Sequence, residues 1–268
     1  MGRPQFNFPT ITPVVKKLLI LNFGIFFVTY ALSLAPGGAG AFLIDYLAVN
    51  PSQWFANPPY FPFWQPLTSG FLHSTNDLGH VVFNMLQLYF FGTMLEGILG
   101  SRRFLWVYLG ALLAGSFAHL LFQPFDNPGI GAIGASGAVL GVLIMTAVLR
   151  PNTRVLLLFI PVSLKWIAIG LVCFDVFGLM QGLRGAPDMV AHWVHLGGAG
   201  FGFLAARKGW IWKDPISDWK VKQERRQASQ IEDEDLKMDD LLGKIHKEGM
   251  SSLSSRERAF LKKVSNRG

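Results

Sequence analysis

The sequence has a single cysteine and few charged side chains. Only 15% of its 268 residues are charged, against roughly 25% in an average soluble domain, whereas 51% are hydrophobic. Cys173 alone excludes an intramolecular disulfide and any cysteine-based metal site. The formal net charge of +7 comes from basic residues scattered in short clusters between apolar runs, which argues against a nucleic-acid partner. The composition therefore indicates a protein that lies in the lipid bilayer.

Six apolar stretches are long enough to cross or nearly cross a hydrocarbon core of roughly 30 Å, at about 1.5 Å per helical residue. We therefore expect an all-α polytopic membrane protein with six transmembrane helices. The first stretch resembles a signal peptide, but further apolar spans follow it, which favours an uncleaved helix. The expected helices cover Leu18–Ala35, Gly79–Leu99, Arg103–Phe122, Gly134–Leu149, Leu164–Gly182 and Met189–Ala206.

Basic residues are unevenly distributed between the two sides of this bundle. If the N-terminus is inside, the inner segments carry clusters such as Lys16–Lys17, Arg102–Arg103 and Arg207–Lys208, whereas the outer loops carry only Arg184. Lys and Arg near membrane ends are retained on the cytoplasmic side, so both termini are expected in the cytoplasm. The second, fourth and sixth helices then begin at the outer face. We expect the membrane to be a bacterial inner membrane.

The chain changes character after residue 213, where it becomes highly charged and lacks apolar runs. We therefore expect a membrane domain over 1–213 and a cytoplasmic helical tail over 214–268. Within the tail, Gly249 is a predicted helix stop, and Ser254 with Glu257 has the spacing of a capping box before a second short helix. A helical hairpin this small has little core of its own. The tail is expected either to dock on the membrane domain or an unknown partner, or to remain solvated.

Polar side chains near the outer ends of three expected helices are functional candidates, because such groups are costly in a membrane. His80 and Asn84 lie one turn apart in the second helix, Ser136 opens the fourth, and His195 lies in the sixth. Taken singly, each has an ordinary explanation as a small packing residue or an interhelical hydrogen-bonding group. Together, at one depth, they supply the groups that acyl transfer needs.

The chemistry that these residues predict uses a serine–histidine dyad. A serine hydroxyl needs a neighbouring base, and neutral imidazole is suited to that task, so Ser136 is the predicted nucleophile and His195 its base. No carboxylate is expected at the same depth, since Asp175 lies within the fifth helix, and this favours a dyad over a triad. The Ser136 backbone amide, with His80 and Asn84, is expected to stabilise the oxyanion. No metal or cofactor is expected.

The motifs resemble those of the rhomboid family of intramembrane serine proteases. The resemblance covers roughly residues 64 to 206 and includes His80-Val-Val-Phe-Asn84, Gly134-Ala-Ser136-Gly137 and His195-Leu-Gly-Gly198, in this order on three helices. It implies a six-transmembrane-helix rhomboid bundle, with Ser136 and His195 as catalytic residues and His80 and Asn84 as oxyanion-stabilising residues. It also implies single-pass transmembrane protein substrates, whose helices unwind near the outer surface and are cut after a small residue.

Two positions depart from the family's pattern. Gln65 stands where many relatives carry an arginine, and Leu140 stands where many carry an aromatic residue that supports the catalytic histidine. Neither change removes a catalytic group. His192, one turn before His195, is expected to be an accessory polar residue at the mouth of the cavity.

Two other functions stay open at this point. A catalytically inactive rhomboid-like protein would bind or escort membrane clients, but such relatives typically lack the serine or the histidine that this chain retains. A transporter or channel would use the same polar residues as a permeation path, and it would be expected to show carboxylates or a broken-helix repeat at the midplane.

Overall fold

The computed structural model describes residues 9–56, 58–59, 61–125, 129–157, 160–184, 190–209, 211 and 215–265. The chain forms two compact units, Met1–Ile211 and Trp212–Gly268, which are considered separately below. The expected domain boundary between residues 213 and 214 lies outside the described residues.

Four helical stretches of the first unit are long and apolar enough to cross a membrane. The fourth and sixth expected spans correspond to shorter helices, α8 (Ser136–Leu149) and α10 (His192–Lys208). The residue at which the sixth was expected to begin, Met189, lies outside the described residues. The all-α membrane fold is thus confirmed, whereas the number of six crossings stays a prediction. The four long stretches are α1 (Pro13–Leu34), Leu78–Leu99, Ser101–Phe125, which contains α7 (Ser101–Phe122) and η3 (Gln123–Phe125), and α9 (Leu164–Leu183).

The stretch Leu78–Leu99 is a composite helix, which the sequence did not predict. It consists of α5 (Leu78–Gln87), a π-helical turn η2 (Leu88–Gly92) and α6 (Thr93–Leu99). A β-carbon added to Gly92 would lie 3.0 Å from a methyl carbon of Val15, so the wide turn ends where α1 packs closely on this span.

The segment between the first two spans is largely helical. It contains α2 (Ala39–Leu47), α3 (Pro51–Ala56), α4 (Gln65–Thr68) and a 3₁₀ turn, η1 (Ser69–Phe71). Gln65, the residue that departs from the family's arginine, is buried, and its amide donates to Gln53 Oε1 at 2.6 Å. This hydrogen bond therefore links α4 to α3 within the segment.

A short antiparallel hairpin joins α8 to α9. Its strands are β1 (Arg154–Leu157) and β2 (Ile160–Ser163), with Arg154 opposite Ser163. The sequence does not predict strands in this connection.

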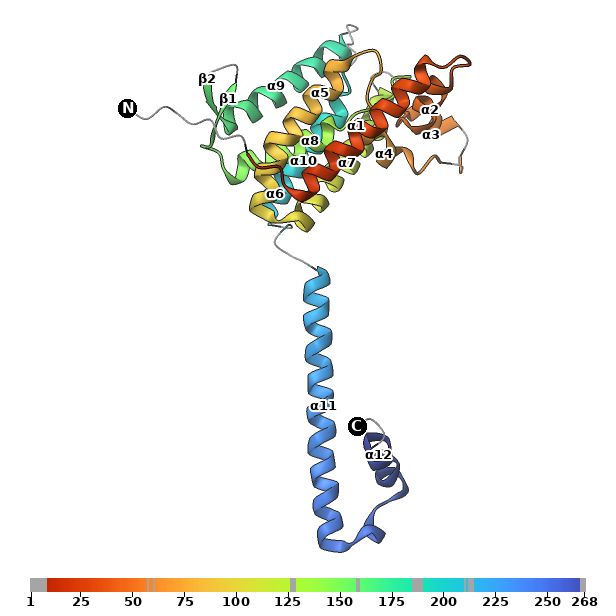
Figure 1. The fold of residues 1–268 in the computed structure, drawn as a ribbon, viewed down its shortest axis with the longest axis vertical. Helices are drawn as coiled ribbons and strands as arrows, with labels where there is room; N and C mark the ends of the chain where they lie inside the picture. Colours follow the sequence, from red (N-terminus) through yellow and green to blue (C-terminus); the bar gives the residue numbers. More distant parts are fainter. Residues whose placement is uncertain are drawn as a thin grey trace, which may run out of the picture. The chain divides into compact units, whose positions relative to one another are not determined.

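Helix α8 lies at the centre of the first unit, among α5, α7, α9 and α10 (Figure 1). Every residue from Gly137 to Ala147 is buried. Its sequence is apolar on all sides, which is the pattern of a helix enclosed by others and not of one with a solvent face. The short fourth span is therefore the core of the bundle.

Helices α8 and α10 touch through facing glycines. A β-carbon added to Gly198 would lie 2.0 Å from the carbonyl oxygen of Gly137, and one added to Gly202 would lie 2.1 Å from that of Gly141. No side chain fits at these separations, so each helix places a pair of glycines, spaced by four residues, against the other's backbone. This contact lies just past the predicted catalytic residues and fixes their helices relative to each other.

Glu96 connects three helices at the far end of the second span. Its side chain is 3% exposed, and its carboxylate accepts hydrogen bonds from the backbone amides of Val14 at 3.0 Å and Val15 at 2.9 Å. It also accepts from Ser101 Oγ at 2.6 Å, at the start of α7. Amides in the first turn of a helix have no partner within the helix, and a negative charge is favoured there. Glu96 therefore caps α1 and ties it to α6 and α7.

The second unit is a helical hairpin of α11 (Pro215–Glu248) and α12 (Ser255–Ser265), joined through η5 (Met250–Ser252). Figure 1 shows α12 folded back beside the end of α11. Gly249, at φ +81°, ends α11 as expected, because this backbone conformation favours glycine.

The predicted capping box begins α12. Ser254 N donates to Glu257 Oε2 at 2.6 Å, and Glu257 N donates to Ser254 Oγ at 3.3 Å. Lys244 of α11 adds an ion pair to Glu257 at 3.1 Å. Leu241 and Leu253 are buried in the turn region of the hairpin. This unit thus has a small core, supported by a cap and a cross-helix ion pair.

Replacing Gly202 with alanine is expected to separate α8 from α10 and to destabilise the protein by about 1–3 kcal/mol, as overpacking does. Gly200 provides a matched control on the same helix, because nothing lies within 4 Å of a β-carbon added there. Thermal unfolding of the purified variants in detergent should show a lower midpoint for Gly202→Ala and a wild-type or higher midpoint for Gly200→Ala. Equal midpoints would show that the glycine contact is not what holds the two helices.

Replacing Glu96 with alanine is expected to leave two backbone amides of α1 without acceptors and to cost about 2–4 kcal/mol. Glu96→Gln, which keeps an acceptor oxygen but loses the charge, should fall between the wild type and Glu96→Ala. Hydrogen–deuterium exchange would report this directly, as faster exchange at the amides of Val14 and Val15. Unchanged protection of these amides in Glu96→Ala would contradict the capping role.

Candidate active site

Ser136 is the first residue of α8. Two residues before it, Gly134 has a backbone conformation that other residues adopt only with strain. Gly134 has φ +123°, and its amide donates to the carbonyl oxygen of Ser69 at 2.9 Å. A β-carbon on Gly134 would lie 2.6 Å from His80 Nε2 and 3.7 Å from Ser136 Oγ. The missing side chain therefore leaves space beside both residues. The amide of Ser136 lies in the first helical turn, where amides have no partner within the helix.

His195 lies one turn into α10 and contacts Ser136 directly. Its Nε2 is 2.7 Å from Ser136 Oγ, a short hydrogen-bonding distance between helices that are far apart in sequence. The imidazole is 19% exposed, so it borders an accessible space. The structure thus brings together the two residues that the sequence singled out as nucleophile and base.

Asp175 also belongs to this cluster, contrary to the expectation that no carboxylate lies at this depth. Its carboxylate is buried, and Oδ1 lies 2.7 Å from Nδ1 of His195. The expectation was wrong because neighbouring helices do not end at one level. Helix α9 continues about two turns beyond Asp175, past the level at which α10 begins. An ionisable residue inside an apolar span was the signal that should have placed Asp175 among the candidates.

His192 is buried, not at the mouth of a cavity as expected. It is 4% exposed, and its Nδ1 lies 2.8 Å from the same Asp175 Oδ1 that contacts His195. A β-carbon on Gly178 of α9 would lie 2.0 Å from His192 Nε2, so the imidazole packs directly on the α9 backbone. Gly178, one turn from Asp175, therefore provides the space for this ring.

Asp175, His192 and His195 are also chemically suited to hold a metal ion. One ligand atom from each lies within 4.8 Å of the others. However, both imidazole nitrogens lie at hydrogen-bonding distance from Oδ1 itself, and direct N–H···O bonds account for this spacing without an ion.

His80 and Asn84 lie on α5, and His80 lies beside Gly134, two residues before Ser136. His80 packs against Gly134 through Nε2, while its Nδ1 accepts a long hydrogen bond of 3.4 Å from the Ser74 amide. With Nδ1 as acceptor, a neutral His80 carries its proton on Nε2, the nitrogen nearer the site. Asn84 is buried, and its amide donates to the His80 carbonyl at 2.8 Å, which uses one of its two N–H groups.

His73, in the turn before α5, is a further neighbour of the site. Its ring is fully buried and meets the His80 ring edge to face, with centroids 5.2 Å apart. Burial, together with the nearby His80, lowers the pKa of His73 to about 3. His73 is therefore uncharged at neutral pH and packs beside His80 as a neutral ring.

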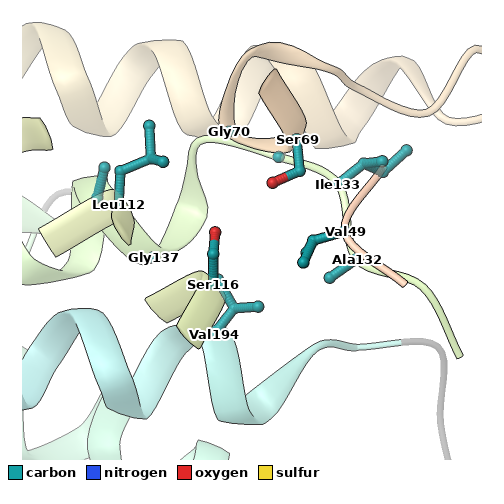
Figure 2. Close-up of a pocket in the computed structure, with 11 residues that line it drawn as sticks. Val49, Ser69, Gly70, Leu112, Ser116, Ala132, Ile133, Gly137 and Val194 are labelled. Carbon is teal, nitrogen blue, oxygen red and sulfur yellow. The ribbon is translucent and has the colours of Figure 1, made fainter. Parts of the chain in front are cut away.

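A narrow cavity adjoins the start of α8 (Figure 2). The hydroxyl groups of Ser69 and Ser116 point into it, and Ser116 Oγ donates to the Pro66 carbonyl at 2.8 Å. Gly134 and Gly137, which flank the catalytic candidate, form part of its wall. The rest of the lining is mostly apolar and includes Val49, Leu112, Ile133 and Val194.

Comparison with known proteins identifies two matching families. The rhomboid domain matches residues 61–211, more than half of the chain, and a family of unknown function, DUF6576, matches residues 221–267. The second match covers most of the tail unit and assigns it no activity.

Several curated proteins are similar to this chain. RHOMBOID-like protein 12, mitochondrial, of Arabidopsis thaliana is 33% identical over 53% of the chain and 46% of its own length. Rhomboid protein 1, mitochondrial, of Saccharomyces cerevisiae is 34% identical over 60% of the chain and 45% of its own length. Rhomboid protease GluP of Bacillus subtilis is 34% identical over 53% of the chain and 25% of its own length.

The chain spans less than half the length of each of these relatives. The matched region nevertheless contains α5, α7, α8, α9 and α10, and with them all the candidate residues described above. By this match, the chain belongs to the rhomboid family.

Proposed function

We propose that this protein is an intramembrane serine endopeptidase that cleaves transmembrane-helix substrates, with Ser136 as nucleophile and His195 as general base. The observation that carries the proposal is the 2.7 Å contact between Ser136 Oγ and His195 Nε2. A serine hydroxyl becomes an effective nucleophile when a positioned imidazole takes its proton. Similarity to a protein named as a rhomboid protease, within the rhomboid family, supports protease activity.

In the proposed reaction, Ser136 Oγ attacks the scissile carbonyl carbon while its proton passes to His195 Nε2. The carbonyl oxygen becomes an oxyanion, which the Ser136 amide and the side chains of His80 and Asn84 would stabilise. The C–N bond then breaks, and His195 gives its proton to the leaving amine. Water, deprotonated by His195, hydrolyses the acyl-enzyme and releases Ser136.

Substrates of this site would be single-pass transmembrane proteins. A continuous helix engages its backbone carbonyls in hydrogen bonds, so a substrate must open locally before Ser136 can attack. Helices α1 and α9 present apolar outer surfaces, with exposed residues such as Phe27, Leu34, Trp166 and Phe177, which suits a protein surrounded by lipid. A substrate that spans the same bilayer would therefore reach the site from within the membrane.

We propose that the site opens at the outer membrane face and that both termini are cytoplasmic, from the distribution of Lys and Arg described above. A bacterial inner membrane stays the proposed location. The curated relatives named above include both mitochondrial proteins and a bacterial one, so they do not select between these membranes. We also propose that 1–213 is the membrane domain and 214–268 a cytoplasmic helical tail, which either docks on the membrane domain or an unknown partner or remains solvated.

The transporter alternative predicted a carboxylate within the membrane, and Asp175 is one. Its carboxylate oxygen is bonded to two imidazoles, one of which contacts Ser136. A buried acid with these partners is explained by a serine–histidine site without a permeation path.

Ser136→Ala and His195→Ala are each expected to lower cleavage of a model transmembrane substrate in proteoliposomes by on the order of 10⁴-fold or more, since each removes an indispensable group. The wild-type protein should release both product fragments. Cys173→Ser serves as the control, because it removes the chain's only thiol at an exposed position of α9 and should leave cleavage unchanged. Wild-type cleavage by Ser136→Ala would refute the proposed chemistry.

A cysteine introduced at Gly129, in a Cys173→Ser background, is expected to react with a membrane-impermeant maleimide in intact cells, because this residue precedes α8 on the proposed outer side. A cysteine at Ser229 in α11 should react only after the membrane is permeabilised. The reverse pattern would invert the proposed orientation.

A further inference from the structure

We propose that Asp175 is the third member of the catalytic site, a positioning residue that holds His195 in the tautomer and orientation needed for its work as a base. This inference rests on the proposed function, and it replaces the predicted dyad with a Ser136–His195–Asp175 triad. Three helices contribute one residue each: α8 the nucleophile, α10 the base and α9 the acid.

Two hydrogen-bonding contacts connect the three side chains in series, from Ser136 through His195 to Asp175. His195 Nε2 lies 2.7 Å from Ser136 Oγ, and His195 Nδ1 lies 2.7 Å from Asp175 Oδ1. A carboxylate only accepts hydrogen bonds, so Nδ1 must carry the proton that it donates to Asp175. In a neutral imidazole the other nitrogen, Nε2, is then unprotonated and faces the serine hydroxyl. Asp175 thereby selects the form of His195 that can receive the Ser136 proton.

The carboxylate also favours the charged form that His195 adopts during the reaction. After proton transfer the imidazole is a cation, and Asp175 lies against it with only 3% of its side chain exposed. An interaction between opposite charges is stronger in such a shielded position than in water. The benefit appears only when His195 is protonated, so it stabilises the transition state more than the resting enzyme.

A second imidazole fixes the position of Asp175. His192 Nδ1 lies 2.8 Å from the same oxygen, and its ring is held against the α9 backbone at Gly178. A buried carboxylate is costly unless donors surround it, and two N–H donors on Oδ1 meet that need. His192 and Gly178 thus keep the acid aimed at His195.

The simplest alternative is that Asp175 only ties α9 to α10, as buried polar residues often do between membrane helices. A purely structural tie would affect stability and the amount of folded protein. It would not change how the rate depends on pH, whereas a carboxylate that acts through His195 must do so. Among the residues that the structure describes, the other titratable groups close to His195 are His192 on its own helix and His80 on α5, and both are retained in the variants below.

The test compares Asp175→Asn with Cys173→Ser, a neighbouring exposed position on the same helix that serves as the control. Asp175→Asn keeps the shape and loses the charge. We expect its kcat on a model transmembrane substrate to fall on the order of 10²- to 10⁴-fold, with KM little changed. The acid limb of its pH–rate profile should move to lower pH, because the imidazolium of His195 loses its anionic partner.

The two proposals fail in distinguishable ways. If the wild-type protein and Asp175→Asn cleave with equal kcat and the same acid limb, Asp175 is not a positioning residue, while the serine–histidine chemistry stands. A lower kcat with an unmoved acid limb in folded protein would also overturn the inference in favour of a structural tie. If the wild type itself does not cleave, or Ser136→Ala does, the proposed function fails first.

A second measurement needs no variant at Asp175 and therefore does not depend on how that variant folds. Nitrogen-15 NMR of ¹⁵N-histidine-labelled wild-type protein in bilayers, with His195→Ala to assign the signal, reports which ring nitrogen is protonated. The inference predicts a proton on Nδ1 of His195 at neutral pH and a bare Nε2. A proton on Nε2 in the resting enzyme would overturn it.

Discussion

Close backbone packing between α8 and α10 sets the geometry of the whole site. Gly137 and Gly141 of one helix face Gly198 and Gly202 of the other at distances that admit no side chain. In lipid there is little hydrophobic drive to press helices together, so close backbone packing of this kind holds them in place. Because Ser136 and His195 lie at the same end of these two helices, the glycine contact also sets the distance between the hydroxyl and the imidazole.

Around this pair, three buried polar side chains are satisfied by specific partners. Glu96 caps the amides of α1, Gln65 holds the connecting segment together, and Asp175 receives two imidazole donors. Such partners are needed because an unpaired polar group is far more costly in a shielded interior than in water. The same desolvation penalty makes Asp175 informative. Burying a carboxylate deep in an apolar helix is energetically costly, and its contact with His195 offers a functional reason for it.

The arrangement of helices also explains why α9 matters to a site whose nucleophile it does not carry. Helix α9 buries only a few of its residues, and Asp175 is one of them. Its packing against α10 consists in part of the His192 ring on Gly178 and of the hydrogen bonds to Asp175. The position of α9 is thus coupled, through one carboxylate, to the orientation of the imidazole on α10.

Much of this could be predicted from the sequence because membrane helices obey strong rules. Apolar length located the spans, and the polar residues at the starts of three of them identified Ser136, His195 and His80. What the sequence could not give were features set by packing between helices. The π turn at Leu88–Gly92 and the helices within the first connecting segment depend on contacts that no periodicity records.

The misplacement of Asp175 and His192 has the same physical origin. Counting residues from helix ends assumes that neighbouring helices begin and end at one level, but α9 extends about two turns beyond the residue that contacts His192. Relative helix shifts of this kind depend on local packing, such as the close approach of the His192 ring to Gly178. The sequence shows that residue 178 is a glycine, but it does not show which side chain packs against it.

We propose that the hydroxyl of Ser136, activated by His195, is the reacting group. Mass spectrometry can test this directly, by mapping the residue that is modified when the wild-type protein reacts with a fluorophosphonate. We expect a single adduct, on the peptide that contains Ser136, and none when His195 is replaced by alanine. An adduct on another residue, or undiminished modification of Ser136 without His195, would contradict it.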